Sequence, residues 1–513
     1  MSKLKIGWAE VNITPEKKIS LTGQFAERIS EYVEKPLTAT AMAVECGGDQ
    51  MILIGCDLAA IEEDLVIDVR EALKDNKAGL DPQKVVLNAI HTHTGPGYSK
   101  AANTPSNWVL DWYNRMKPFL REDQVYEEAA SITGNPEIAT DEEVFDLLVE
   151  RISKVALLAW ENRKPGSFKN AFDRAAVGMC RRVDYSDGTA QMWGDSNTAV
   201  FTELEGGNDS GVEIMFTYDE NKKLTGAMVN VCCPAQCVQH RLFVSPDYWG
   251  ETKKLLRERF GEDFFMLPTC STAGDQCPVD LVRWVNPDTD VHDPNLIRHN
   301  PPVRKADPSM FDLEGMKKAG RRVANAVKDA FDELTGEFQS DIPFEHHVHN
   351  MQLPLRRVTL SEKIAAEKGL AEYCRGITGN VNFMDVANCQ KFFGVTERFE
   401  EQETKNIVDT EVHVIRMGSV AIATFPYEVF LDYGNQIKAR EYCEQSFLIQ
   451  LANGSMGYLP TRKAEGHGHY SAFVGSGVVG HEGGDLMVRE TLKDINRMFE
   501  KDYRTYQYLS EKA

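Results

Sequence analysis

The 513-residue sequence lacks any apolar run close to the roughly 20 residues that a helix needs to cross a bilayer. It begins with MSKLKIGWAE, which has no long apolar core of the kind found in signal peptides. Basic side chains are scarce, because 57 Lys and Arg stand against 78 Asp and Glu, for a net charge of −21. Such a surface repels phosphate backbones and anionic lipid headgroups. We therefore expect no nucleic-acid partner and no membrane insertion.

A disulfide framework is missing as well. The eleven cysteines are odd in number, are scattered along the chain and include no C-x-x-C pair. Thiols distributed in this way are typical of proteins kept reduced in the cytoplasm. We therefore predict a cytoplasmic location.

The sequence has no internal repeat, low-complexity tract or Gly/Ser linker. Short apolar runs alternate with amphipathic stretches, which predicts an α/β fold with a mixed β-sheet core flanked by helices. The predicted strands are 51–56, 85–90, 224–231, 264–267, 412–417, 420–425 and 447–451. The predicted helices are 65–75, 141–160, 252–260, 316–334, 361–373, 430–442 and 486–500.

Reactive polar side chains follow the ends of several predicted strands. His91 follows strand 85–90, Cys233 follows strand 224–231 and Glu428 follows strand 420–425. Sites of α/β proteins cluster just beyond the C-terminal ends of strands. Because such groups are spread along most of the sequence, we predict one catalytic domain over residues 1–513, with its site at the strand ends. Loop-rich insertions are expected near 99–140 and 286–307.

The segment HTHTGPG at 91–97 carries the most chemical information. Residues two apart on a strand share a face, so His91 and His93 should project together just before Gly95 and Pro96 break the strand. Two converging imidazoles suit metal binding or proton transfer. A solvated turn is the alternative for this pattern taken alone.

Eight segments, in order along the chain, resemble the motifs of the neutral/alkaline non-lysosomal ceramidases. They are GWAEVNITP at 7–15, HTHTGPG at 91–97, RR at 181–182, NVCCP at 230–234, SPDYWG at 245–250, GDQCP at 274–278, FPYE at 425–428 and NGSMGYLPT at 453–461. The resemblance extends from about residue 5 to residue 500. It implies a ceramidase-like catalytic domain that hydrolyses an amide with one Zn²⁺.

Carried over by position, the resemblance implies His91, Glu428 and Tyr458 as zinc ligands, and Cys233 at the place of the family's second His. Thiolate is a good zinc ligand. His240 or Cys237 could bind in its place after a loop shift, or the metal could be lost.

Other family positions imply further roles. The resemblance assigns His93 to proton transfer or oxyanion stabilisation, although it could instead orient His91. Arg181 is expected to contact the substrate, with an ordinary ion pair as the alternative. Asp275 and Cys277 fall in the GDQCP motif and are counted as catalytic, although Cys277 could be an inert buried thiol. Gly95 and His469, which lies on a glycine-rich loop, are expected to line the substrate pocket.

A second histidine cluster, His346, His347 and His349, lies outside these motifs and is interpreted as a solvated strand edge. The resulting hypothesis is a zinc-dependent hydrolase that cleaves an amide bond of a small soluble substrate. A small-molecule substrate fits better than ceramide because the chain ends soon after the last motif, without the family's immunoglobulin-like C-terminal domain. The alternatives are a metal-dependent lyase or isomerase acting on a sugar or sugar acid, and a binding protein that has lost the metal. The sequence is silent on the oligomeric state.

Overall fold

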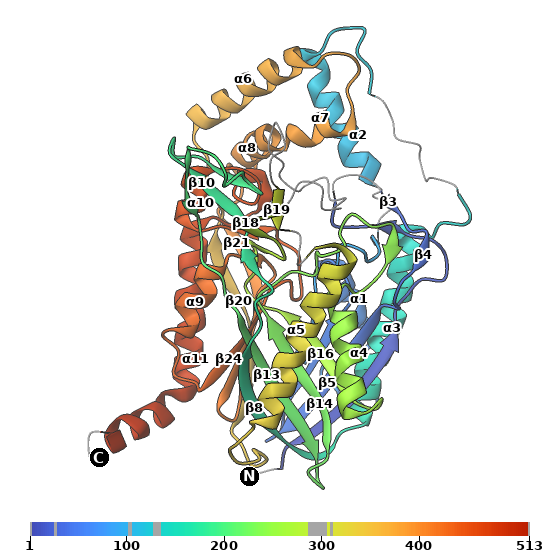
Figure 1. Cartoon of the computed structure of the whole chain (residues 1–513), viewed down its shortest axis with the longest axis vertical. Helices are drawn as coiled ribbons and strands as arrows, with labels where there is room; N and C mark the ends of the chain where they lie inside the picture. The colour runs from blue at the N-terminus through green and yellow to red at the C-terminus, as the bar shows by residue number, and fades with distance from the viewer. Residues whose placement is uncertain are drawn as a thin grey trace.

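The computed structural model describes residues 3–24, 28–100, 105–126, 135–285, 305–307 and 311–510. An eight-stranded sheet and a four-stranded sheet pack against each other, and helices cover the outer face of each sheet (Figure 1). This layered arrangement confirms the predicted α/β fold with a mixed sheet core flanked by helices.

The large sheet has the strand order β16-β14-β13-β8-β1-β5-β6-β7. Its strands are β1 (Lys5–Asn12), β5 (Thr38–Cys46), β6 (Asp49–Cys56), β7 (Val85–Ala89), β8 (Lys164–Arg174), β13 (Gly211–Asp219), β14 (Leu224–Val231) and β16 (Phe265–Cys270). The two outermost pairs, β6–β7 and β14–β16, are parallel, and the pairs between them are antiparallel. The sheet is therefore mixed, and parallel strands lie at both edges.

The small sheet has the order β20-β21-β22-β24. Its strands are β20 (Phe344–Pro354), β21 (Ile407–Met417), β22 (Val420–Thr424) and β24 (Gln445–Ile449). Only its last pair, β22–β24, is parallel. Met42 and Leu53 of the large sheet share an apolar cluster with Ile415 and Phe447 of the small sheet. Since side chains alternate between the faces of a strand, the other faces of both sheets are free to bury helices.

The helices cover those outer faces. One half of the large sheet packs on α1 (Glu63–Ala72) and α3 (Asp141–Glu161), and the other half on α4 (Tyr248–Phe260) and α5 (Asp312–Asp332). The small sheet packs on α9 (Leu431–Lys438) and α11 (His481–Ser510). All seven predicted strands and all seven predicted helices are present, with shifted bounds. The predictions missed five long strands: β1, β5, β8, β13 and β20.

A separate helical layer lies at the top of Figure 1. It consists of α2 (Pro105–Met116), α6 (Leu360–Gly376), α7 (Phe383–Asn388) and α8 (Gln390–Glu401), and it has its own apolar cluster. A segment expected to be loop-rich, 99–140, thus contains helix α2, while its residues 127–134 lie outside the described part. Most of the expected insertion at 286–307 also lies outside the described residues, which include the short strand β19 (Lys305–Asp307).

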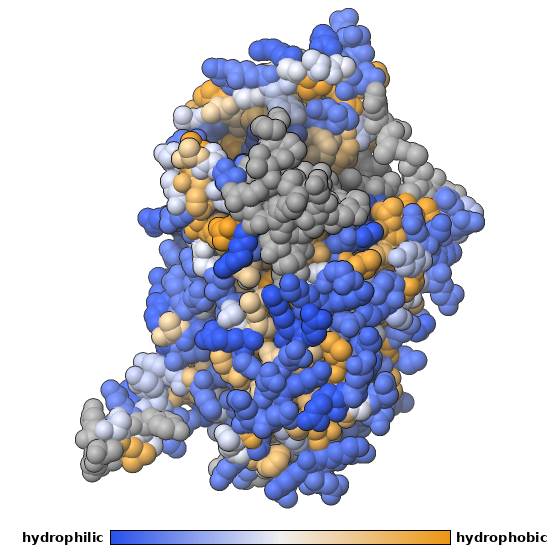
Figure 2. Space-filling model, viewed as in Figure 1, coloured by the Kyte–Doolittle hydropathy of each residue, from blue (hydrophilic) through white to orange (hydrophobic). Residues whose placement is uncertain are grey.

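Hydrophilic residues predominate on the face of the molecule shown in Figure 2. Apolar residues gather near β4 (Tyr32–Val33), where Tyr32 is 56% and Val33 45% exposed. In the described part of the chain, no helix combines the length and the apolar character that a membrane span requires.

Candidate active site

Three of the predicted site residues come from strand ends that the fold brings together. His91 lies two residues beyond β7, Glu428 begins β23 (Glu428–Val429) and Tyr458 begins β25 (Tyr458–Leu459). Strands β23 and β25 are parallel, and Glu428 pairs directly with Tyr458. The Nε2 atom of His91 lies 3.4 Å from Oε2 of Glu428. Residues far apart in sequence therefore form one polar cluster.

The orientation of the His91 ring is set by the backbone. Its Nδ1 atom lies 2.6 Å from the carbonyl oxygen of Ala59. A carbonyl can only accept, so Nδ1 carries a proton, and Nε2 is the ring atom that faces Glu428. His91 also has a positive φ of 65°, which a non-glycine residue seldom adopts. This arrangement is how proteins hold an imidazole that binds a metal through Nε2.

His93 faces the same point. Its Nε2 atom lies 3.2 Å from Nε2 of His91 and 2.9 Å from the side-chain nitrogen of Gln236. Burial lowers the pKa of His93 well below its usual value, and His91, Arg28 and Arg181 lower it further. His93 is therefore neutral at pH 7. Because His93 is neutral, its Nε2 accepts the hydrogen bond from the Gln236 amide.

These distances fit a zinc ion. Zinc lies about 2.0–2.1 Å from nitrogen and carboxylate ligands, so two ligands of a tetrahedral site are roughly 3.3 Å apart. The contacts of His91 with His93 and with Glu428, at 3.2 Å and 3.4 Å, have this separation. Nitrogen and oxygen donors are also the types that zinc accepts. The donor types and the spacing of His91 from Glu428 therefore suit the zinc ion that the sequence motifs imply.

Arg181 and two tyrosines complete the cluster. The Nη2 atom of Arg181 donates to the carbonyl of Gly274 at 2.8 Å and to the hydroxyl of Tyr458 at 3.1 Å. The rings of Tyr458 and Tyr470 stand edge to face, with centroids 5.5 Å apart. Burial raises the pKa of Tyr458 well above its usual value; Glu428 and Tyr470 add to this and Arg181 opposes it. The sequence motifs had singled out neither Tyr470 nor Gln236.

The structure does not bring the thiol of Cys233 into this cluster. Cys233 is buried among apolar side chains, and its Sγ atom lies 3.5 Å from the carbonyl oxygens of Val177 and Pro234. Burial raises its pKa well above the usual value, which disfavours a thiolate. After β14 the backbone turns tightly at Cys233 and again at Gln236. Gln236, three residues later than expected, is the side chain that reaches His93.

The two substitutes considered for Cys233 also lie elsewhere. Cys237 is fully buried in the same apolar cluster. His240 stacks on Phe311 with ring centroids 5.6 Å apart, and its Nε2 lies 3.5 Å from a carboxylate oxygen of Asp312. Within the described part of the chain, neither residue forms a hydrogen bond or ion pair with His91 or Glu428, because the 233–240 segment folds back against α4 and α5.

Asp275 and Cys277 lie behind Arg181. The backbone oxygen of Asp275 accepts from the N–H of Arg181 at 2.9 Å, and its Oδ1 accepts from the N–H of Leu431 at 2.9 Å. Burial raises the pKa of Asp275 to about 6. Cys277, in β17 (Gln276–Cys277), is buried in an apolar cluster with Val183. Both residues are placed to support Arg181.

The predicted pocket residues Gly95 and His469 have structural contacts. A Cβ atom on Gly95 would lie 3.2 Å from a methyl group of Thr92, so the backbone is packed closely there. The Nδ1 atom of His469 accepts from the N–H of Met192 at 3.1 Å. Burial, together with the charge of Arg182, lowers the pKa of His469 to about 4. His469 thereby holds the glycine-rich loop in place as a neutral acceptor.

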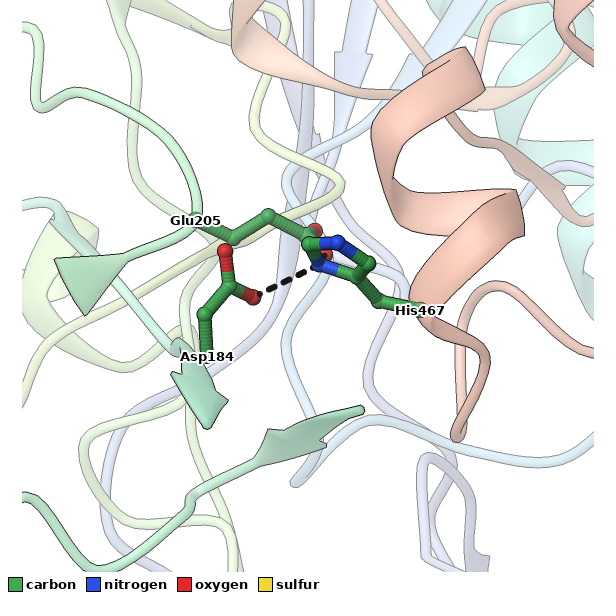
Figure 3. A group of neighbouring side chains, drawn as sticks. All are labelled: Asp184, Glu205 and His467. Atoms are coloured by element: carbon green, nitrogen blue, oxygen red, sulfur yellow. Dashed lines mark hydrogen bonds and ion pairs between the residues drawn. The ribbon is translucent and has the colours of Figure 1, made fainter. Parts of the chain in front are cut away.

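A second group of side chains, apart from the cluster of His91 and Glu428, has ligand atoms close enough together to hold a metal ion. Ligand atoms of Asp184, Glu205 and His467 lie within 4.8 Å of one another (Figure 3). However, Arg182 is fully buried and forms an ion pair with Glu205, and Lys463 lies 2.9 Å from Asp184. These two cations already balance the two carboxylates. We interpret the group as an ion-pair network that anchors α10 (Arg462–His467).

The histidine cluster of β20 divides in two. His347 and His349 are partly exposed, as expected for a strand edge. His346 is buried, at 3% exposed, which corrects the prediction of a solvated residue. Its Nε2 lies 2.8 Å from Nδ1 of His413, and its Nδ1 lies 2.9 Å from the carbonyl oxygen of Gln50. The reason is that β20 packs against the large sheet at β6.

The fold and the cluster define an α/β protein whose polar site lies at the ends of strands from both sheets. Among solved structures, the chain is similar to the neutral ceramidase from Pseudomonas aeruginosa, with a TM-score of 0.65 and 16% identity over 98% of this chain and 75% of that one. A second structure, described as ceramidase complexed with C2, has a TM-score of 0.63 and 15% identity over 98% and 76%. The chain therefore has a ceramidase-like fold, as its motifs predicted. No family model and no curated protein matches the sequence.

Proposed function

We propose that this protein is a zinc-dependent hydrolase that cleaves an amide bond of a small soluble substrate. One observation supports this most directly: Nε2 of His91, with its proton directed to Nδ1 by Ala59, lies 3.4 Å from Glu428 and 3.2 Å from His93. Such a set of neutral imidazoles and a carboxylate at strand ends suits a metal site. The ceramidase-like fold is consistent with amide chemistry.

In this proposal, His91, Glu428 and Tyr458 hold the zinc. Three protein ligands are typical of catalytic zinc sites, which keep one position open. When bound, zinc acts as a Lewis acid toward a carbonyl oxygen and toward water. Cys233 is no longer needed as a fourth ligand, and His93 is near enough to bind or to assist.

The remaining residues of the cluster have distinct roles. His93, which is neutral, accepts a proton at Nε2 in place of the hydrogen bond from Gln236 and returns it to the leaving amine. Arg181 stabilises negative charge that develops near Tyr458. Asp275 holds the backbone of Arg181 in place. We further propose that all of these residues belong to one catalytic domain, and that the protein works in the cytoplasm. The free thiols of all eleven cysteines are consistent with that location.

The proposal is tested on protein purified without chelator. We expect about one zinc per chain, and zinc-dependent release of amine from short N-acyl compounds. His91→Ala should abolish both, whereas His347→Ala, an exposed histidine, should change neither. Turnover without net addition of water would contradict hydrolysis in favour of a lyase or isomerase. Efficient release of sphingosine from ceramide would contradict a small soluble substrate.

A further inference from the structure

Arg181 is a buried cation without an acidic partner. It is 3% exposed, and none of the described carboxylates forms an ion pair with it. Its Nη2 atom contacts Gly274 and Tyr458, its Nε atom is enclosed without a partner, and Nη1 makes no hydrogen bond within the described residues. Unlike Nε, Nη1 is not fully enclosed. Although burial opposes its charge, Tyr458 and Glu428 nearby raise the pKa of Arg181. Because none of the described carboxylates contacts the guanidinium directly, Nη1 is available for an anion of a ligand.

A second arginine adds positive charge on the other side of His93. Arg28 donates to the backbone oxygens of His93 at 2.6 Å, Thr22 at 2.7 Å and Arg241 at 3.2 Å. Within the described ranges it too has no carboxylate partner. Burial lowers the pKa of Arg28 to about 10. Among the described residues, its guanidinium hydrogen-bonds only to backbone carbonyl groups.

Other arginines of low exposure in this chain are paired. Arg182 pairs with Glu205, Arg398 with Glu401, and Arg416 with Asp502. With a net charge of −21, acidic side chains are abundant. Arg181 and Arg28, which have no carboxylate partner among the described residues, both lower the pKa of His93 at the candidate active site. Their positive charge therefore acts within the site, where Glu428 offsets part of it.

We propose that the substrate carries a carboxylate, which binds to Nη1 of Arg181 in the field of Arg28. This inference rests on the proposed function, and it narrows the substrate to amides with an acid group, such as N-acylated amino acids. The alternative role for Arg181 is to stabilise only the oxyanion of the reaction. If that were its only role, substitution of Arg181 would slow the hydrolysis of neutral and anionic amides by the same factor.

The test compares N-acetylglycine with N-acetylglycinamide, which differ in charge at a single group. Binding is measured by calorimetry on the metal-loaded protein, and hydrolysis by amine release. A charged hydrogen bond contributes about 1.5–3 kcal/mol, so we expect the acid to bind roughly 10- to 100-fold more tightly than the amide. Arg181→Gln should remove the preference and Arg181→Lys should keep part of it. Arg489→Gln, an exposed arginine, is the matched control.

The wild-type comparison alone tests the inference if Arg181→Gln fails to fold. Equal binding of both compounds, binding of neither, or a preference that survives Arg181→Gln would overturn it. A carboxylate preference without any hydrolysis would contradict the proposed function and leave the inference standing. Efficient hydrolysis of the neutral amide, without tighter binding of the acid, would overturn the inference and leave the proposed hydrolase function standing.

Discussion

The Nε2 atoms of His91 and His93 lie 3.2 Å apart, and each ring is held by a second group: Nδ1 of His91 donates to the Ala59 carbonyl, and the Gln236 amide donates to Nε2 of His93. The side chain of Gln239 also hydrogen-bonds to His93 and raises its pKa. The geometry of His93 therefore depends on these glutamines, of which Gln236 lies on the side that faces His91.

This dependence gives the first prediction. Gln236→Ala should lower kcat by roughly 10- to 100-fold, the usual effect of removing a group that orients a metal-site residue. Zinc content, measured by mass spectrometry, should stay near one per chain. Gln352→Ala on β20, an exposed glutamine, is the control. Unchanged kcat would show that His93 needs no support.

The second prediction concerns Cys233. Because its thiol is enclosed by apolar groups, Cys233→Ala should leave zinc content unchanged. The variant should lose about 1 kcal/mol of unfolding free energy, as is typical for a small buried truncation. Denaturant unfolding and metal analysis on the same sample measure both. Loss of zinc with an unchanged unfolding midpoint would return Cys233 to the metal site.

The position of Cys233 shows which parts of the site could be predicted from the sequence and which could not. Strand ends are marked by apolar runs followed by polar residues, so His91 and Glu428 could be placed at one edge of the fold. The direction of a side chain in the turn after β14 depends on hydrogen bonds of Cys233 and Gln236 that have no sequence signal. The motifs implied Cys233 at the place of the family's second His, whereas the side chain from this turn that reaches His93 is that of Gln236.

The burial of His346 between the two sheets could not be predicted from the sequence either. The histidine cluster was interpreted as a solvated strand edge, but the stacking of the small sheet on β6 encloses His346. Its contact with Gln50 joins segments almost three hundred residues apart. Packing between sheets is a tertiary property, and a local pattern carries little information about it.

The third prediction follows from His346. Burial lowers its pKa well below the usual 6.5, and His413 lowers it further. As the pH falls through about 6.5, the unfolded chain takes up a proton that the folded chain refuses, so stability is lost toward acid. The loss approaches about 1.4 kcal/mol per pH unit for this histidine. Urea unfolding between pH 8 and pH 5 should show a shallower fall in His346→Gln than in the wild type.

His347→Gln serves as the control for this titration because that side chain is partly exposed. Its pH profile should follow the wild type. The pKa of Asp49, beside His346, is lowered, so this carboxylate stays charged over the range and contributes no slope. Burial lowers the pKa of His413, which contacts His346, so His413 contributes a slope of the same sign. Equal slopes in His346→Gln and the wild type would place the acid sensitivity elsewhere, with His93 as the next group to substitute.

The fourth prediction separates an ion-pair anchor from a metal site at Asp184, Glu205 and His467. Arg182 is fully buried and pairs with Glu205, so Glu205→Gln leaves an uncompensated buried charge. Breaking a buried pair in this way typically costs roughly 3–5 kcal/mol. We therefore expect Glu205→Gln to lower the free energy of unfolding by this amount. The zinc content should stay unchanged, because the proposed zinc site contains His91 and not Glu205.

If Asp184, Glu205 and His467 instead bind a metal, Glu205→Gln should change the metal content of the protein. Loss of one ligand would then lower the metal content, and added zinc would restore the stability of the wild type after chelation. Replacing Lys463 with Met is the matched test, because it removes a cation that pairs with Asp184. For an anchor, Lys463→Met destabilises α10 and leaves the zinc content unchanged. For a metal site it removes a competing charge and should increase zinc binding.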